Sequence, residues 1–335
     1  MSPQFKVVIT DHYFPTVDPE REILKEIDAE VVELGTRDPE TIIAAARDAD
    51  AVIVGHALFT PELIAQLERC RVIVRYGVGF DNVDLDAATA HGIYVCNVPD
   101  YCTDDVATHA IMLALACLRR LPHQMQVART DNWKAGVTGD VPRLAGLTFG
   151  ILGLGRIGSA AARKARGLGC QVIACDPYIE PEQFAAVDAT PVTFEELLAR
   201  SDILSLHTPL TPETRGLFDE ETLRKMKPSA ILVNTARGPI VRNAALVRAL
   251  REGWIAGAGL DVLEQEPAPP DEPLLHEPHA IVTPHIAWYS ETAKLELQKR
   301  AAQEVVRVLT GEGPRNLVNP EVVGRARATR QTSHP

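Results

Sequence analysis

The sequence predicts an α/β protein with two doubly wound parallel sheets. Three observations support this prediction: short apolar runs alternate with helical patterns over residues 1–98, a long apolar helix follows residue 102, and a second alternating series starts at residue 147. Strands that alternate with helices pair in parallel, with the helices on the faces of the sheet. A chain of 335 residues is also long for a single core, which favours two domains.

The first series contains five apolar runs that we expect to be strands. They are KVVIT (6–10), VVEL (31–34), AVIVG (51–55), VIVRY (72–76) and IYVCN (93–97). The segments between them include DPETIIAAARDAD and TPELIAQLERC, which begin with Asp38 and Thr60. Asp and Thr are good N-caps, so both segments are expected to be helices.

The helix after residue 102 separates the two series. In TDDVATHAIMLALACLRRLP, Thr103 is the expected N-cap, acidic residues occupy the first turn, arginines occupy the last, and Pro122 is expected to end the helix. The middle of this segment is apolar on nearly every side. Such a helix is buried on several sides, by its own domain or by a second subunit. We favour a subunit interface, which predicts a homodimer through this domain.

The second series predicts a longer sheet followed by one long helix. Its expected strands are LTFGILGLG, QVIACD, ILSLHTP, AILVNTAR, IAGAGLDV and AIVTPH. The closing segment SETAKLELQKRAAQEVVRVLTG (290–311) has amphipathic spacing, and Ser290 is its expected cap.

Composition argues against several classes of function. The net charge of -11, with a pI near 5.4, disfavours a nucleic-acid binder, because such proteins rely on clustered Lys and Arg. The longest apolar stretch, at 110–118, has nine residues and is too short to span a bilayer. The N-terminus leads almost directly into a strand, so we expect no signal peptide. The six cysteines form no CxxC pair and no cluster has zinc spacing, so we expect reduced thiols, no metal and a cytoplasmic protein.

A glycine-rich motif predicts a dinucleotide site. Gly153, Gly155 and Gly158 form a GxGxxG pattern that follows an apolar strand and opens an Ala-rich helix. Gly153 permits the tight turn, Gly155 lets the backbone approach the pyrophosphate, and Gly158 allows the helix to pack closely on the strand. The N-terminus of the helix then offers free N–H groups and a partial positive charge to the phosphates.

Asp176 ends the next strand, 18 residues past the third glycine. This is the expected position of the acid that binds the adenosine ribose hydroxyls. Its charge would repel a 2′-phosphate, and the following PYIEPEQ contains no Arg or Lys. The sequence therefore predicts NAD in preference to NADP.

Three charged or titratable residues fall at or just beyond the carboxyl ends of strands in the second series. Arg237 follows ILVNTA, Glu266 follows AGLDVLEQ, and His285 follows IVTP. Ligands of doubly wound sheets bind at these ends, so the fold can bring the three residues to one edge. Reduction of a 2-oxo acid by hydride needs a proton for the carbonyl oxygen and a cation for the carboxylate. His285 is suited to exchange the proton, Glu266 to orient the ring and stabilise the imidazolium, and Arg237 to bind the carboxylate and polarise the carbonyl.

The motifs GLGRIG, LHTPLTPETRGL, NTARGPIV, AGLDVLEQEP and TPHIAWYS, in that order, resemble the D-isomer-specific 2-hydroxyacid dehydrogenases. The resemblance covers essentially the whole chain. It implies that the catalytic Arg, Glu and His are Arg237, Glu266 and His285. It further implies cofactor contacts by the glycine motif with Arg156, Ile157 and Asp176, by Asp261 at the nicotinamide carboxamide, by Thr235 and Ala236 at the nicotinamide, and by His207, Thr208 and Pro209 at the adenosine.

The resemblance also implies the domain organisation. A Rossmann NAD domain, 99–289, would be inserted into a flavodoxin-like substrate domain made of 1–98 and 290–335, with two hinges that let a cleft close. The backbone around Gly77, Val78 and Gly79 would bind the substrate carboxylate, since a bare backbone can approach an anion. Tyr76 replaces a smaller residue often found there and is expected to shape the pocket.

Two further residues are candidates for the substrate pocket. Trp288 is the leading candidate for a wall of the pocket, and His56, after AVIVG, is a candidate from the substrate domain. Most of the remaining histidines are expected to be surface or capping groups.

The segment AWYSE looks most like the C-terminal-binding-protein branch, whose animal members are corepressors. The alternative function is therefore an NADH-sensing interaction protein with little turnover, although no long extension follows the last helix. A dehydrogenase acting on another anion, such as phosphite, would be expected to add cations near residues 76–79, where we find only Arg75.

Overall fold

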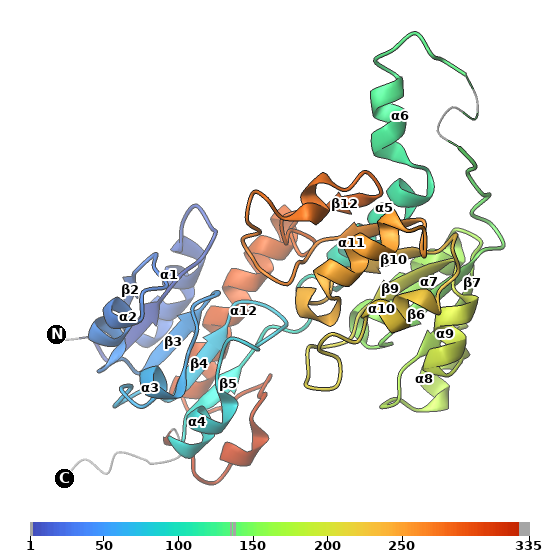
Figure 1. The fold of residues 1–335 in the computed structure, drawn as a ribbon. Coiled ribbons are helices and arrows are strands. Elements are labelled where there is room, and N and C mark those ends of the chain that lie inside the picture. Colours follow the sequence, from blue (N-terminus) through green and yellow to red (C-terminus); the bar gives the residue numbers. More distant parts are fainter. Residues whose placement is uncertain (1–2, 135, 137–138, 328–335) are drawn as a thin grey trace, which may run out of the picture. The chain divides into compact units, whose positions relative to one another are not determined.

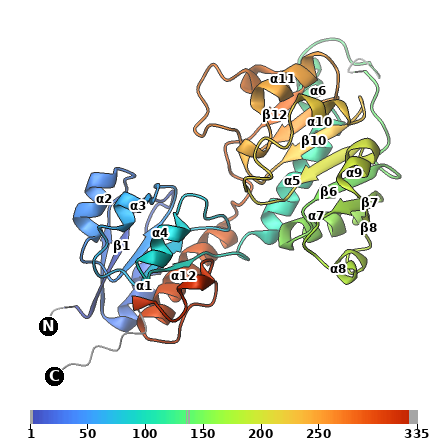
Figure 2. The ribbon, with the colours of Figure 1, turned by 60° about the horizontal axis from the view of Figure 1, so that its bottom comes forward.

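The computed structural model describes residues 3–134, 136 and 139–327. The chain divides into two compact units, which are described separately. Unit 1 comprises Met1–Tyr101 and Ser290–Pro335, and unit 2 comprises Cys102–Tyr289. In Figures 1 and 2, unit 1 is coloured blue to cyan and then red, and unit 2 is coloured green to orange.

Unit 1 contains a five-stranded parallel sheet in the order β2-β1-β3-β4-β5. The strands are β1 (Phe5–Ile9), β2 (Ala29–Glu33), β3 (Ala51–Val54), β4 (Val72–Arg75) and β5 (Tyr94–Cys96). All five expected strands are confirmed within one or two residues. The strand order is the flavodoxin-like one, in which the direction of winding reverses between β1 and β3.

Helices cover both faces of this sheet. They are α1 (Asp18–Leu24), α2 (Pro39–Ala46), α3 (Pro61–Ile64), α4 (Leu85–Ala90) and α12 (Glu291–Leu309). Helices α1 and α12 lie together on one face, and α2, α3 and α4 cover the other (Figure 2). The predicted caps are confirmed: Asp38, Thr60 and Ser290 each accept a hydrogen bond from a backbone N–H in the first turn.

Unit 2 contains a seven-stranded parallel sheet in the order β12-β11-β10-β9-β6-β7-β8. The strands are β6 (Thr148–Leu152), β7 (Gln171–Cys175), β8 (Thr190–Pro191), β9 (Ile203–Leu206), β10 (Ile231–Asn234), β11 (Gly257–Leu260) and β12 (Ala280–Val282). The two-residue β8 was not predicted, because both of its residues are exposed and it lacks an apolar run. This is the Rossmann order, in which the winding reverses between β6 and β9.

The helices of unit 2 also form two layers. They are α5 (Thr103–Leu118), α6 (Leu121–Val127), α7 (Arg156–Gly167), α8 (Pro181–Ala185), α9 (Phe194–Arg200), α10 (Glu220–Arg224) and α11 (Asn243–Arg251). Helices α5 and α7 pack on one face of the sheet, where small alanines allow close approach, and α9, α10 and α11 pack on the other. Short 3-10 turns occur at Lys25–Ile27, Gly238–Ile240, Pro273–His276 and Pro320–Val322.

The predicted ends of the long apolar helix were wrong in detail. The N-cap of α5 is Cys102, without a side-chain cap, and Thr103 is the first helical residue. The helix ends at Leu118, and Arg120 takes a left-handed conformation with φ of 51°. Pro122 then lies in the first turn of α6, where a missing N–H costs nothing. The proline therefore starts a second helix, which stands away from the rest of unit 2 (Figure 1).

None of the described helices is long and apolar enough to cross a membrane.

Candidate active site

The loop after β6 has the glycine geometry of a phosphate-binding turn. Gly153 has φ of +88°, and a Cβ there would lie 2.9 Å from the His207 carbonyl. A Cβ on Gly158 would lie 2.0 Å from the Gly153 oxygen, whereas a Cβ on Gly155 would meet no atom within 4 Å. Two of the glycines are thus needed for packing, and the third leaves open space at the N-terminus of α7. That space suits a pyrophosphate.

Asp176 lies at the end of β7 and is joined to the glycine loop. Its carboxylate accepts hydrogen bonds from Leu154 N at 2.8 Å and from Tyr178 N at 3.0 Å. These bonds hold a negative charge beside the glycine turn, and they leave lone pairs for further donors.

The loop after β9 lies against the same turn. Its His207 backbone packs on Gly153, and its ring Nε2 is 2.9 Å from Ser205 Oγ. Burial lowers the pKa of His207 to about 4, so the ring is neutral near pH 7. Thr208 is partly buried and Pro209 is exposed. The residues expected at the adenosine end of the cofactor therefore lie on neighbouring loops around the switch point.

A buried asparagine positions the loop that carries Arg237. Asn234 is fully buried at the end of β10; its Oδ1 accepts from Ala236 N at 3.0 Å and its Nδ2 donates to Arg237 O at 2.9 Å. The Thr235 hydroxyl is buried and has no partner in the structure. An unpaired buried hydroxyl costs stability, so a ligand that bonds to it would fit this position.

A close approach of two loops brings Arg237 toward Glu266. A Cβ on Gly238 would lie 1.8 Å from the Leu263 oxygen, so only glycine lets the loop after β10 lie against the loop after β11. The guanidinium of Arg237 is close enough to contribute to lowering the pKa of Glu266.

Glu266 and His285 form a direct pair. His285 Nδ1 is 2.5 Å from Glu266 Oε2, and Glu266 Oε1 accepts from Leu263 N at 3.0 Å. Burial raises the pKa of Glu266, but the bonds and charges of His285, Leu263 and Arg237 together outweigh it, so the pKa is lowered and the carboxyl group is ionised. The two side chains are 30% and 35% exposed, so the pair is open to an incoming molecule.

Asp261 holds the loop that carries His285. Its carboxylate is almost fully buried and accepts from Thr283 Oγ1 at 2.5 Å, Ile286 N at 2.9 Å and Ala287 N at 2.8 Å. Its carbonyl oxygen accepts from His285 N at 2.8 Å. His285 has φ of +54°, a conformation that non-glycine residues adopt only where surrounding contacts impose it. The loop thus uses most of the hydrogen-bonding capacity that we expected Asp261 to offer to the cofactor.

Trp288, the expected wall of the substrate pocket, lies just after His285 in unit 2. Trp288 is partly buried and its ring packs edge-on against Tyr289, with centroids 5.6 Å apart. Tyr289 is 44% exposed. This arrangement gives the His285 loop an aromatic surface on its C-terminal side.

In unit 1, the loop at residues 76–79 has a different character. Tyr76 is 5% exposed; its hydroxyl donates to Glu20 Oε1 at 2.5 Å, and its ring meets Phe14 edge-on. The side chain therefore points into unit 1, where its contacts are structural, and its place at the substrate stays a prediction. Gly77 has φ of +136°, and Val78 and Gly79 are partly exposed.

His56 and His109 lie in different units and have different contacts. His56 lies after β3, its ring 5.2 Å from that of exposed Tyr13. Most of the remaining histidines were expected to be surface or capping groups. His109 is partly buried on α5, and its Nε2 is 2.9 Å from Thr283 Oγ1. Sequence spacing gave no signal for this contact, because the two residues are 174 positions apart. Asn234 was also missed, although an amide at a strand end is a common way to fix a loop.

No group of three His, Cys, Asp or Glu side chains that could hold a metal ion occurs among residues 3–134, 136 and 139–327. The six cysteines are free thiols.

The fold and the polar residues at the carboxyl edge of the unit 2 sheet define a class of protein, a nicotinamide-dependent dehydrogenase with a Rossmann unit. Comparisons with known proteins identify the family. Residues 111–287 match the model described as D-isomer specific 2-hydroxyacid dehydrogenase, NAD binding domain. A glyoxylate reductase of Korarchaeum cryptofilum is 41% identical over 294 residues, which cover 85% of this chain and 87% of the relative. A D-3-phosphoglycerate dehydrogenase of Mycobacterium bovis is 39% identical over 84% of this chain and 53% of its own length.

A solved structure agrees with these matches. The D-lactate dehydrogenase of Aquifex aeolicus, complexed with NAD and lactic acid, has a TM-score of 0.85 and 29% identity, covering 93% of this chain and 99% of that one. The chain belongs to the D-isomer-specific 2-hydroxyacid dehydrogenase family. It is an oxidoreductase that acts on the CH–OH group of 2-hydroxy acids with a nicotinamide cofactor. The narrower likeness to the C-terminal-binding-protein branch stays a prediction.

Proposed function

We propose that the protein catalyses reversible hydride transfer between NAD(H) and a 2-oxo or 2-hydroxy acid, with His285 as the general acid and base. The observation that supports this most directly is the His285–Glu266 pair, 2.5 Å apart and close to Arg237 at one edge of the Rossmann sheet. Nδ1 of His285 is committed to Glu266, so Nε2 is the nitrogen that would exchange the proton.

Each member of the set has a separate role in reduction. His285 gives a proton to the carbonyl oxygen as C2 accepts the hydride, which the cofactor supplies. Glu266 is ionised, so it favours the imidazolium and fixes the ring. The Arg237 guanidinium can bind a carboxylate through two parallel hydrogen bonds and polarise the carbonyl. The family resemblance further implies that the backbone at Gly77, Val78 and Gly79 in unit 1 binds a substrate carboxylate.

We also propose NAD as the preferred cofactor. Asp176 is held beside the glycine turn by Leu154 N, where its charge favours the ribose hydroxyls and repels a 2′-phosphate. The open space at Gly155 and the unpaired hydroxyl of Thr235 are about where the pyrophosphate and the nicotinamide would lie.

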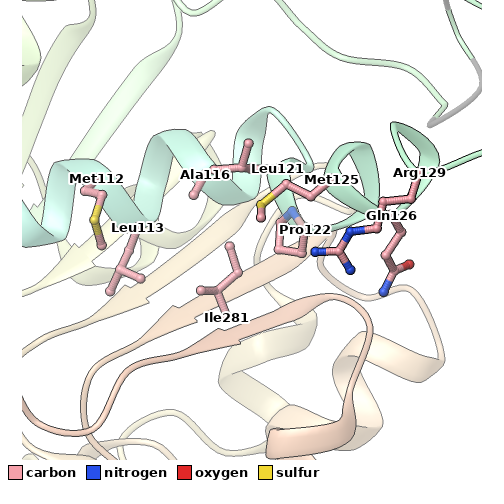
Figure 3. A pocket seen from close by; sticks show the side chains of 9 residues that line it. All are labelled: Met112, Leu113, Ala116, Leu121, Pro122, Met125, Gln126, Arg129 and Ile281. Carbon is pink, nitrogen blue, oxygen red and sulfur yellow. The ribbon is translucent and has the colours of Figure 1, made fainter. Parts of the chain in front are cut away.

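A second copy of the chain is the expected partner. A groove of about 400 Å³ lies between α5, α6 and β12 (Figure 3). It is lined by Met112, Leu113, Ala116, Leu121, Pro122, Met125, Gln126, Arg129 and Ile281. Met112, Leu121 and Met125 are 45–54% exposed, and an exposed apolar patch of this kind is typical of an interface. We propose a homodimer through unit 2, in the cytoplasm, where its free thiols would stay reduced.

The test is an activity panel read by NADH absorbance. Purified protein is given glyoxylate, hydroxypyruvate, 3-phosphohydroxypyruvate, phenylpyruvate and 4-methylthio-2-oxobutyrate, each with NADH or NADPH. We expect turnover with at least one acid and a higher kcat/KM with NADH. Tight NADH binding without turnover on any acid would contradict the proposal and favour the NADH-sensing alternative. Phosphite-dependent NADH formation would point to the third candidate.

A further inference from the structure

We infer that His109 is a positioning residue for the acid–base histidine, acting through Thr283 and Asp261. The inference rests on the proposed role of His285. The three side chains come from distant parts of unit 2: His109 from the middle of α5, Asp261 from the residue after β11, and Thr283 from the residue after β12. Their polar atoms meet beneath the loop that carries His285.

The direction of the hydrogen bonds follows from the chemistry of the groups. Asp261 Oδ1 can only accept when ionised, so the Thr283 hydroxyl, 2.5 Å away, donates its one proton to it. The same hydroxyl oxygen is 2.9 Å from His109 Nε2 and can then only accept. His109 therefore carries a proton on Nε2. The same nitrogen lies 3.5 Å from Asp261 Oδ1, so its N–H dipole also interacts favourably with the carboxylate.

The contact of His109 with Thr283 and Asp261 is shielded from water, and it holds the loop that carries His285. The side chains of His109 and Asp261 are 16% and 1% exposed, so water competes little for the donors and acceptors. Asp261 is the residue onto which the loop folds: it accepts from Ile286 N, Ala287 N and His285 N. His109 fixes the threonine and the aspartate, and these fix the backbone of His285 in its left-handed conformation.

The position on α5 explains why this contact can be rigid. Helix α5 packs on β10 and β11 and on α7, so its backbone is held independently of the loop. A Cβ on Gly259 in β11 would lie 2.8 Å from Leu113 Cβ, which shows how closely the helix lies on the sheet one turn beyond His109. The imidazole is thus held by the helix and can fix the position of the loop that carries His285.

The test separates the position of the donor from the mere presence of a polar side chain. A Gln amide nitrogen can take the place of imidazole Nε2, whereas an Asn nitrogen reaches only the place of Nδ1. We expect His109→Leu and His109→Asn to lower kcat roughly 10- to 100-fold, because small misplacements of catalytic groups cost that much. KM for the 2-oxo acid should change by less than about twofold, and His109→Gln should recover most of kcat.

A double-mutant cycle tests the route. If His109 acts through Thr283, then His109→Leu should cost little more in a Thr283→Val background, where the accepting hydroxyl is already absent. The matched control is His279→Leu, at the exposed amino end of the same strand that leads to His285. This variant should keep the wild-type kcat, and thermal unfolding of all variants shows whether any loss is one of folding.

The outcomes distinguish the role of His109 from the role of His285. Wild-type kcat in His109→Leu, equal losses in Gln and Leu, Asn behaving like Gln, or full additivity with Thr283→Val would each refute the positioning role. His285→Ala is measured alongside. If that variant keeps wild-type activity, the proposed function fails as well; if it is inactive while His109→Leu is normal, only the inference about His109 fails.

Discussion

Units 1 and 2 have the same kind of parallel sheet, but their polar groups are used differently. In unit 1, Asp11 follows β1 at the switch point and accepts from His56 N at 2.8 Å, Ala57 N at 3.1 Å and Arg37 Nε at 2.9 Å. Burial raises the pKa of Asp11, yet these bonds and the Arg37 charge outweigh it and lower the pKa overall. The carboxylate holds loops together.

At the corresponding edge of unit 2, polar groups face open space or lack partners. Gly155 has no neighbour where a side chain would lie, the Thr235 hydroxyl has no acceptor, and the His285–Glu266 pair is about a third exposed. A buried polar group without a partner is costly in a folded protein unless a ligand uses it. We therefore place the proposed reacting groups in unit 2, whereas the polar groups of unit 1 described above hold its own loops together.

Among substitutions outside His285 itself, replacing Glu266 by Gln should give the largest effect on kcat. The amide removes the charge that stabilises the imidazolium, and its NH2 group would face Nδ1 if its oxygen keeps the bond from Leu263 N. Loss of an orienting carboxylate costs up to about 10⁴-fold in kcat in the serine proteases, so we expect a fall of at least roughly 100-fold. Reduction should then need a lower pH. Steady-state kcat across pH 5 to 9 checks this; an unchanged profile would place the acid–base group elsewhere.

Two alanine substitutions in the glycine loop separate protein packing from cofactor binding. Gly158→Ala must push a Cβ against the Gly153 oxygen, 2.0 Å away, and overpacking typically costs 1–3 kcal/mol, so its Tm should fall by roughly 2–10 °C. Gly155→Ala meets nothing in the protein and should keep its Tm, but it should weaken NADH binding by about tenfold or more. Differential scanning fluorimetry and NADH fluorescence titration separate the two. Equal behaviour of the variants would mean that the space at Gly155 has no ligand role.

Tyr76→Phe tests whether the Tyr76 hydroxyl stabilises unit 1 or contacts the substrate. The variant removes a donor to the buried Glu20 carboxyl, and hydrogen bonds to charged groups contribute about 1.5–3 kcal/mol. Burial raises the pKa of Glu20 and the Tyr76 bond opposes that rise. A raised folded-state pKa means that stability is lost as pH increases through it, so in the variant the loss should extend to higher pH. Urea unfolding at pH 5 and 8 measures this. A large fall in kcat with normal stability would instead place Tyr76 at the substrate.

Replacing His207 should give the smallest effect, a change in stability that is visible only at acidic pH. Burial lowers its pKa to about 4, so as pH falls below about 6.5 the unfolded chain takes up a proton that the folded chain refuses. Stability should therefore decline between pH 6.5 and 4, by at most roughly 1.4 kcal/mol per pH unit. His207→Gln lacks this contribution and should lose roughly 1–2 kcal/mol less than wild type between pH 7 and 5. Parallel slopes for the two proteins would show that His207 is not buried in solution.

Much of the fold followed from the sequence because its signals are local. Strand positions, the three caps and the glycine turn depend on residues within a few positions of each other. β8 was missed because two exposed residues carry no apolar pattern. Pro122 was misread because proline is compatible both with a stop and with a first helical turn, and only the left-handed Arg120 decides between them.

The site was predictable only where strand ends bring residues together. The pairing of Glu266 with His285 follows from adjacent strands β11 and β12. Contacts such as His109 with Thr283, or Tyr76 with Glu20, join segments whose packing no short pattern encodes. Tyr76 shows the consequence: its place beside Gly77 suggested a pocket wall, whereas side-chain direction at the end of β4 turns it into the core.

The most direct measurement is kcat/KM of His285→Ala with the best substrate from the panel, together with NADH binding by fluorescence. We expect a fall in kcat/KM of roughly 10²–10⁴-fold, with the Kd for NADH within about threefold of wild type because the glycine loop is untouched. Near wild-type kcat/KM in this variant would contradict the assignment of His285 and with it the claim that the chemistry lies at this edge of unit 2.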